Sequence, residues 1–481
     1  MSILKNKKII IAAAIVIVVT ACIVGGIFLF AGDRQEEPTL DEIIQEKLSA
    51  YQTDLLDSLE SMETNDDVAA YLVNWGKNKK ISTSRDSKGN VIFTIDAAEE
   101  HKDQAASVII CGYDAENMTD YIESIAVALT VAKNSIHNCA YKVVFCPESK
   151  GEKIGIEKLS SSLFTDDTRV FYLGKSGTSK VSQITGGYRQ YVLSKNLKST
   201  VSEYDKAYRI RISGIPSEVM DSKLGGTPNA IKTLGNLLAN FKSTSMLFEI
   251  SGFSGGISGN MIPSSAEVDI VINSSDTAKF ESKMNSAIEK FMEKYSDNYP
   301  DAVYAYEEID VPSQVLAKTD SDNIVSLMYT VLNGVYNKDD DGNVVAITNI
   351  GEISLKDGKL NINISAMSSS QEYLDEITDS YRTISGLCNV KYECMEEYDI
   401  YNGAGIAAND ELFAAFKTSF MNFTGDSEMN DENAVEFTPL TILAKKNEKM
   451  PMLYLGITEK TKEKYAGSIV TFLDMGVAEE S

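Results

Sequence analysis

The chain has 481 residues, with 45 basic and 70 acidic side chains and a formal net charge of −25. This length suffices for two or more domains, and 24% charged with 9% aromatic residues indicates a globular chain. The negative charge argues against nucleic acid and anionic lipid as partners. The only histidines are His101 and His137, too few for a site that needs several imidazoles.

An uncharged stretch near the start predicts a transmembrane anchor. After Lys8 no charged residue occurs over 9–32, a length that crosses the roughly 30 Å apolar core of a bilayer as a helix. Basic residues precede this stretch and mostly acidic ones follow it. We therefore expect residues 1–8 in the cytoplasm, 33–39 as a linker, and the rest outside the cell, in a single-pass protein of the cell membrane.

A cleaved lipoprotein signal is the alternative interpretation of this stretch. Val19 to Cys22 fits the bacterial lipoprotein cleavage box, which would leave Cys22 carrying lipid. Secretory signals usually have an apolar core of about 7 to 15 residues, whereas this run continues to Phe30. The longer run favours an uncleaved anchor, and both interpretations tether the chain outside the cell.

Beyond the linker, the residue pattern predicts an α/β domain with a mainly parallel sheet. Apolar residues recur at helical spacing from Leu40 to Asn78, which predicts two helices. The elements expected next are strands 80–84 and 90–95, a buried strand 106–111, a helix 118–135 and a buried strand 141–145. Alternating buried strands and helices are typical of α/β proteins.

A different order of elements predicts an inserted αβ-sandwich lid of two units. The first unit comprises strand 207–213, helix 229–242, strands 246–251 and 266–273, and helix 277–295. A similar order recurs from about Ile324, with strands 344–350 and 359–366, helix 371–385 and strand 389–394. The expected boundaries are 40–203 for the first part of the α/β domain, 204–398 for the lid, and 399–481 for the second part.

The cysteines beyond Cys22 do not form a recognisable framework. They are Cys111, Cys139, Cys146, Cys388 and Cys394. Their number is odd and no two have C-x-x-C spacing, which argues against a zinc ribbon or a thioredoxin-type site. We expect them to be small buried hydrophobic residues.

Two short motifs have a catalytic and a metal-binding interpretation, respectively. Gly252 to Gly256 approaches the nucleophile elbow G-x-S-x-G, but a strand rather than a helix is expected after it, which favours a simple loop between strands. Asn337 to Gly342 has the opening spacing of a calcium loop, yet Thr348 stands where a bidentate Glu belongs. A solvated loop is the favoured interpretation, and weak calcium binding is the alternative.

The collinear order of four segments resembles the zinc exopeptidases of the aminoacyl-histidine dipeptidase, carnosinase and peptidase T type. The segments are 65–95, 107–146, 208–238 and 255–270. In the last of them, Asn260, Ile262-Pro263 and Ala266-Glu267 match the family's Asn-x-Ile-Pro-x-x-Ala-Glu turn. The resemblance covers nearly all of 40–481 and implies an exopeptidase-like α/β domain carrying the lid.

The family uses two zinc ions held by two histidines and three carboxylates, with a glutamate as general base. In this chain the first His-x-Asp falls on Tyr113-Asp114-Ala115, and the bridging aspartate falls on Asp120. The Glu-Glu pair of base and ligand falls on Ser149-Lys150, directly after Glu148. Only Asp120 survives as a family metal ligand at these positions.

The remaining family positions are also changed. The next acidic ligand falls on Gly174, the lid histidine falls near Val219, and no histidine occurs between Gly456 and Lys464. The resemblance therefore implies a degenerate member that keeps the scaffold and lacks most metal ligands and the general base, so no cofactor is expected.

The resulting interpretation is a membrane-anchored extracellular peptidase homologue without catalysis, on a bacterial cell surface. It would bind a peptide, a cell-wall fragment or a partner protein in the former substrate cleft. The cleft residues expected are Tyr113, Asp114, Asp120, Ser149, Lys150 and Asn260. Lys150 would favour an anionic group such as a peptide carboxylate.

Two alternatives remain open. One is an active metal-dependent peptidase with a divergent site, either zinc-dependent or with Asp114, Asp120 and Glu148 around a hard cation. The other is a structural surface protein without a ligand.

Overall fold

The structure, a computed structural model, describes residues 38–97, 106–133, 139–148, 154–174, 180–220, 226–403, 405–430 and 438–475. The predicted anchor over 9–32, Cys22, both histidines, Ser149 and Lys150 lie outside these residues. Within the described part of the chain, no helix combines the length and the apolar character needed to span a membrane.

The two helices predicted at the start are confirmed. Helix α2 (Leu40–Ser58) buries Ile44, Leu48, Tyr51 and Leu55, which recur every three or four residues along one face. Helix α3 (Asn65–Asn78) begins with a capping box, in which the Thr64 hydroxyl accepts from the backbone of Asp67 and the Asp67 carboxylate accepts from the backbone of Thr64.

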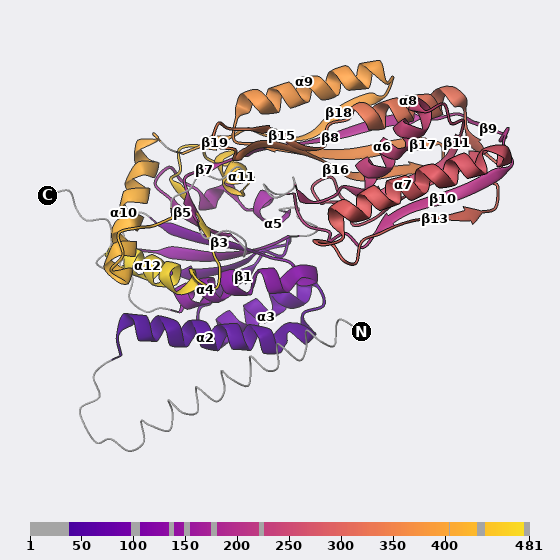
Figure 1. The fold of residues 1–481 in the computed structure, drawn as a ribbon. Coiled ribbons are helices and arrows are strands. Elements are labelled where there is room, and N and C mark those ends of the chain that lie inside the picture. Colours follow the sequence, from indigo (N-terminus) through magenta and orange to yellow (C-terminus); the bar gives the residue numbers. More distant parts are fainter. Residues whose placement is uncertain are drawn as a thin grey trace. The chain divides into compact units, whose positions relative to one another are not determined.

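The α/β domain is built on a seven-stranded mixed sheet (Figure 1). In spatial order the strands are β1 (Ser82–Arg85), β2 (Val91–Ile95), β4 (Tyr141–Pro147), β3 (Ser107–Tyr113), β5 (Arg169–Gly174), β20 (Met452–Gly456) and β6 (Val181–Ser182). The four strands β4, β3, β5 and β20 are parallel, and the flanking pairings are antiparallel. The predicted mainly parallel sheet is therefore confirmed for the centre of the sheet.

Helices cover both faces of this sheet. One face carries α2, α3, α4 (Ile122–Ala132), α10 (Ala407–Thr424) and α12 (Lys462–Met475), and the other carries the short α5 (Ile154–Glu157) and α11 (Leu440–Ala444). Strand β3 is buried along its whole length and sends alternate side chains into the two cores. The expectation for the cysteines is confirmed at four positions, since Cys111, Cys139, Cys146 and Cys388 are free and buried, while Cys394 is partly exposed.

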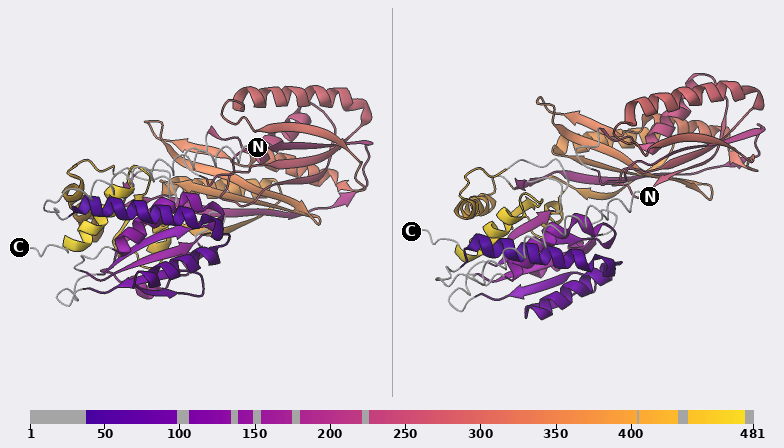
Figure 2. Two further views of the ribbon diagram at one scale, coloured as in Figure 1. Left: turned by 90° about the horizontal axis from the view of Figure 1, so that it is seen from below. Right: turned by 60° about the horizontal axis from the view of Figure 1, so that its bottom comes forward.

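The lid contains one antiparallel nine-stranded sheet. Its order is β13 (Val303–Ile309), β10 (Lys206–Ser213), β12 (Ala266–Ile272), β11 (Glu249–Gly256), β16 (Val344–Lys356), β17 (Lys359–Ser368), β8 (Gly187–Asn196) and β18 (Lys391–Tyr398), with β15 (Gly334–Lys338) paired to β16. Helices α6 (Ala230–Ser243), α7 (Thr277–Tyr295), α8 (Lys318–Thr330) and α9 (Gln371–Leu387) share one apolar core with it. Figure 2 shows the long α7 running beside the lid strands.

The two predicted lid units have the same strand order. From its outer edge, the first unit has the strand order β13-β10-β12-β11, and the second has the order β18-β8-β17-β16. When the strands of each unit are numbered along the chain, both units have the spatial order 4-1-3-2. The units join through antiparallel pairing of β11 with β16, where Ser254 faces Ser354. The lid is thus a duplicated unit with approximate internal symmetry.

The expected boundary at 203/204 differs from the observed sheet membership. Strand β8, which begins at Gly187, pairs with β17 and β18 and so supplies the first strand of the second lid unit. The whole first unit is inserted between β8 and α8. The expected boundary places this strand in the α/β domain, because its long-range pairing leaves no local sequence signal.

The glycines of the Gly252–Gly256 motif serve the junction between the two units. Strand β11 continues through the motif with a bulge after Ile250, so no nucleophile elbow forms. Gly256 has φ +70°, and a Cβ atom there would collide with the carbonyl oxygen of Gly351 on the adjoining strand. Close approach of the two backbones requires glycine at this position.

The Asn337–Gly342 segment forms a hairpin turn rather than a calcium loop. The carboxylate of Asp339 accepts hydrogen bonds from the backbone nitrogens of Asp341 (3.1 Å) and Asn343 (2.7 Å) and from the side-chain amide of Asn343 (3.0 Å). Its oxygens are therefore occupied within the turn, which agrees with the favoured interpretation of a solvated loop.

Gly256→Ala should destabilise the protein by about 2 kcal/mol or more, because the new Cβ meets the Gly351 carbonyl at a positive φ. Urea unfolding followed by circular dichroism measures this. Gly386→Ala in α9, where a Cβ meets nothing within 4 Å, is the matched control and should be neutral or slightly stabilising. Equal stability of the two variants would contradict the proposed role of the junction.

Candidate functional site

Tyr113 stands at the carboxyl end of β3, where the resemblance expects a metal-binding histidine. Its side chain is fully buried, and its hydroxyl donates a hydrogen bond of 2.8 Å to the carbonyl oxygen of Gly89. Burial raises the pKa of this phenol well above its ordinary value. Tyr113 therefore joins β3 to the hairpin between β1 and β2 and borders a surface hollow of about 640 Å³ there.

Asp114 is buried, and its carboxylate caps the short helix that follows it, η3 (Ala115–Asp120). One carboxylate oxygen accepts from the backbone nitrogen of Glu116 at 3.2 Å, and the other accepts from the amide of Asn117 at 3.0 Å. Both oxygens thus have a local structural role.

Asp120, the family ligand that survives in the sequence, is the last residue of η3 and is exposed. Its negative charge adds to the burial that raises the pKa of Tyr121. Asp120 lies two residues before α4, in the segment that follows the carboxyl end of β3.

Glu148 is the buried carboxylate at this end of the sheet, only 2% exposed. It accepts hydrogen bonds from the hydroxyls of Tyr121 at 2.7 Å and Tyr172 at 3.1 Å. Burial raises the pKa of both tyrosines, and the charge of Glu148 adds to the effect, so each phenol stays protonated as a donor. The sequence interpretation included Glu148 only in the alternative metal site.

The backbone around Glu148 is equally well held. Its nitrogen donates to the carbonyl oxygen of Tyr113 at 2.7 Å. The side chain of Asn65 donates to the carbonyl oxygen of Glu148 and accepts from the nitrogen of Ala115, both at 2.8 Å. A Cβ on Gly112 would collide with the Glu148 carboxylate, so glycine is needed beside it.

Gly174 ends β5 where the resemblance expects an acidic ligand. A Cβ at this position would collide with the hydroxyl end of Tyr454. The phenol of Tyr454 therefore occupies the space that an acidic side chain at position 174 would need. Tyr454 also stacks on Tyr172, with ring centroids 6.0 Å apart. Tyrosine side chains thus surround the strand ends at which the family carries metal ligands.

The lid residues expected in the cleft make their observed contacts within the lid. The side chain of Asn260 accepts from the hydroxyl of Ser258 at 2.7 Å, and its carbonyl oxygen accepts from the nitrogen of Met220 at 2.8 Å. Val219 forms an isolated bridge with Met261. The expected cleft residues Ser149 and Lys150 lie outside the described residues.

Comparison with known proteins agrees with this architecture. A profile of the peptidase dimerisation domain of the M20 family matches residues 222–299, and no curated protein matches the chain in sequence. The structure of an aminoacylhistidine dipeptidase from Vibrio alginolyticus superposes with a TM-score of 0.62 at 16% identity, covering 91% of this chain and 99% of that one. The chain has the fold of the M20 peptidase family.

Two other solved structures superpose less well and add nothing to this conclusion. A tripeptidase from Staphylococcus aureus gives a TM-score of 0.46 at 11% identity over 90% of this chain and 98% of that one. Human carnosine dipeptidase 1 gives 0.45 at 10% identity over 91% and 99%.

The residues at the strand ends of this M20 fold do not fit a pair of zinc ions. Among the described residues, no group of three or more His, Cys, Asp or Glu side chains is placed to hold a metal ion. Asp114 and Glu148 direct their oxygens to hydrogen-bond donors of the protein. The chain therefore has the fold of a metallopeptidase family, but its described residues do not form that family's metal site.

Tyr121→Phe should lower the free energy of unfolding by about 1 to 3 kcal/mol, because the buried Glu148 carboxylate loses a donor. Urea unfolding at neutral pH measures the loss. Tyr401→Phe is the matched control, since within the described structure the buried Tyr401 hydroxyl has no hydrogen-bond partner, and it should be neutral or stabilising. An equal loss of unfolding free energy in the control would show that the hydrogen bond from Tyr121 to Glu148 does not stabilise the protein.

Proposed function

We propose that this protein is a membrane-anchored extracellular M20 peptidase homologue that binds its ligand without hydrolysing it. The observation that carries the proposal is the Glu148 network, in which a buried carboxylate at the strand ends binds two tyrosine hydroxyls. In the peptidases that the sequence resembles, zinc ligands are expected at this end of the sheet. The ligand proposed is a peptide, a cell-wall fragment or a partner protein in the former substrate cleft.

The chemistry of the replaced positions supports this proposal. A protonated phenol such as Tyr113, hydrogen bonded to a carbonyl, is a poor substitute for an imidazole ligand. Gly174 offers no ligand atom, and Tyr454 occupies the adjoining space. An intact dinuclear site requires several ligands at once, so the single remaining Asp120 does not restore it.

The runner-up is an active peptidase with a divergent metal site. Its support is the buried Glu148 carboxylate close to the strand ends, together with Asp114 and Asp120 as further oxygen donors for a hard cation. Binding a cation there would have to break the capping bonds of Asp114 or the tyrosine bonds of Glu148. That cost favours the non-catalytic proposal.

Zinc content tests the choice directly. The full-length protein, purified in detergent, loaded with zinc and washed free of excess, should retain close to no metal by mass spectrometry, because the described residues include no group of three His, Cys, Asp or Glu side chains placed to hold a metal ion. A known dinuclear zinc peptidase carried through the same wash is the control. Retention of about two zinc ions per chain, with dipeptide hydrolysis that a chelator abolishes, would overturn the non-catalytic proposal.

The anchor is the second part of the proposal, and the uncharged run over 9–32 supports it. The full-length protein should sediment with membranes and resist extraction by high salt, whereas a variant beginning at residue 38 should be soluble. Cys22→Ser should leave sedimentation unchanged if the anchor is uncleaved. Release by Cys22→Ser would instead establish the lipoprotein alternative, and a soluble full-length protein would refute both.

A further inference from the structure

A second surface hollow lies entirely within the lid. It has a volume of about 660 Å³, within the range of small-molecule sites. Helix α6 and the residues before it form one wall, the end of α7 contributes Tyr295, and the β15–β16 hairpin forms the opposite wall. None of its lining residues belongs to the Glu148 network or to the former metal positions, so this site lies beyond the function proposed above.

The charge of this lid hollow is opposite to that of the chain. About one residue in seven of the whole sequence is acidic, yet the lining residues that the structure describes include Lys232 and Lys338 and no Asp or Glu. Asp339, Asp340 and Asp341 follow Lys338 in the hairpin turn but are not among the lining residues, so the two ammonium groups of the lining favour a negatively charged ligand over a neutral or cationic one.

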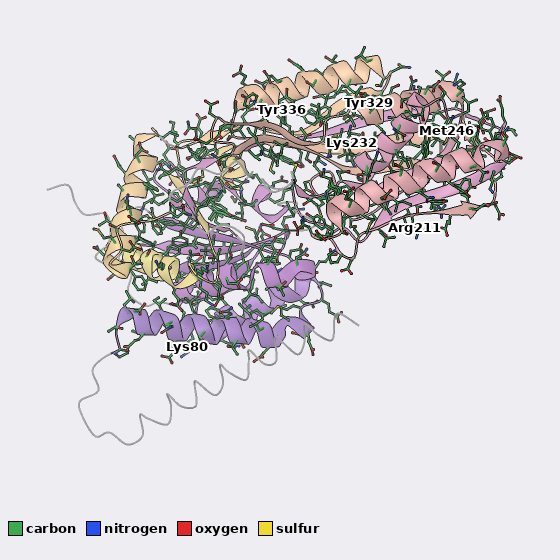
Figure 3. The ribbon with its side chains drawn as sticks, in the orientation of Figure 1. Lys80, Arg211, Lys232, Met246, Tyr329 and Tyr336 are labelled. Atoms are coloured by element: carbon green, nitrogen blue, oxygen red, sulfur yellow. The ribbon has the colours of Figure 1, made fainter. Side chains whose placement is uncertain are left out.

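Lys232 lines the hollow, and its ammonium is held by backbone carbonyl oxygens at the end of α8. Its ammonium donates to the carbonyl oxygens of Met328 at 2.8 Å, Tyr329 at 3.0 Å and Val331 at 2.7 Å, and thereby closes the carboxyl end of α8. Figure 3 labels Lys232 and Tyr329 in these neighbouring elements. Burial lowers the pKa of Lys232 to about 8, which leaves it largely protonated at neutral pH.

Three asparagines hold the two walls together. The side-chain amide of Asn229 donates to the side-chain oxygens of Asn333 at 2.9 Å and Asn349 at 3.0 Å. Its side-chain oxygen accepts from the backbone nitrogen of Lys232 at 2.9 Å. Because this network connects the first lid unit with the second, the lid hollow is preorganised across their junction.

Several polar groups of the lining remain available to a ligand. Within the described residues, no hydrogen bond or ion pair engages the Lys338 ammonium or the side-chain amide of Asn236, and Asn333 uses only its oxygen. Thr233 uses its hydroxyl proton on the carbonyl oxygen of Asn229 and keeps its lone pairs as acceptors. An ammonium, amide donors and a hydroxyl acceptor thus face one space.

From this combination we propose that the lid hollow binds an acidic sugar, that is, a sugar ring bearing a carboxylate. Lys338 pairs with the carboxylate, while the amides of Asn236 and Asn333 and the hydroxyl of Thr233 bind ring hydroxyl or acetamido groups. Tyr295 and the apolar residues Pro228, Val335 and Val344 contact the C–H faces of the ring. The volume exceeds that required by a simple anion and suits one or two sugar rings.

The test compares two sugars that differ in one carboxylate-bearing group. N-acetylmuramic acid carries a lactyl carboxylate that N-acetylglucosamine lacks, so the full-length protein in detergent should bind the first at least about tenfold more tightly by calorimetry, as expected for a charged hydrogen bond. Lys338→Glu should weaken binding of N-acetylmuramic acid at least about tenfold without affecting binding of the neutral sugar by more than about twofold.

Matched variants separate the site from general charge effects. Lys449→Glu makes the same charge change at a lysine 71% exposed in the other domain and should leave both affinities unchanged. Asn236→Ala, on the exposed side of α6 where alanine favours the helix, should weaken both sugars. Inorganic phosphate at the same concentration should compete only weakly.

The proposal is overturned if neither sugar binds at millimolar concentration, if Lys338→Glu and Asn236→Ala bind as the parent does, or if phosphate competes as well as the acidic sugar. The last result would identify a general anion site. Zinc content is unaffected by any of these outcomes, so failure of the sugar site is distinguishable from failure of the non-catalytic proposal.

Discussion

A buried carboxylate without a nearby solvent shell has to be satisfied by hydrogen-bond donors, and Glu148 imposes this constraint on the α/β domain. The hydroxyls of Tyr121 and Tyr172 meet it from η3–α4 and β5, while Asn65 and Tyr113 bind the backbone on either side. The side chain and the backbone of Glu148 together therefore link three strands and two helices at the edge where α/β proteins usually bind ligands. The same bonds that satisfy the charge also engage its oxygens, which is why structural stability and metal binding compete at this position.

The lid depends on a different constraint, the close approach of two strand backbones at its centre. The β11–β16 pairing converts two βαββαβ units into one sheet, and glycines at 256 and 351 make that approach possible. Because the units meet edge to edge, residues from both line the lid hollow, and the Asn229 network crosses between them. The lid hollow therefore takes its lining from both units, and neither unit contains it by itself.

Local patterns in the sequence predicted most elements well. The sequence predicts helix α7 at its observed residues and helices α6 and α9 to within two residues at each end, because amphipathic periodicity and capping signals are local. Strand β8 was missed as a lid strand because its partners, β17 and β18, lie more than 150 residues away. The sequence indicates Glu148 only as a member of the alternative metal site, since the two phenols that bind it come from other segments of the chain.

The sequence by itself determined the scarcity of imidazoles, the acidic net charge, the uncharged stretch near the start and the order of elements that resembles the exopeptidases. These are properties of composition and of local periodicity, which do not depend on how distant segments meet. Only the tertiary structure decided that Asp114 caps a helix, that tyrosines bind Glu148, and that Lys232 and Lys338 line one hollow. The physical reason is that hydrogen-bond satisfaction and local charge balance arise between residues far apart in the chain, where folding alone sets the distances.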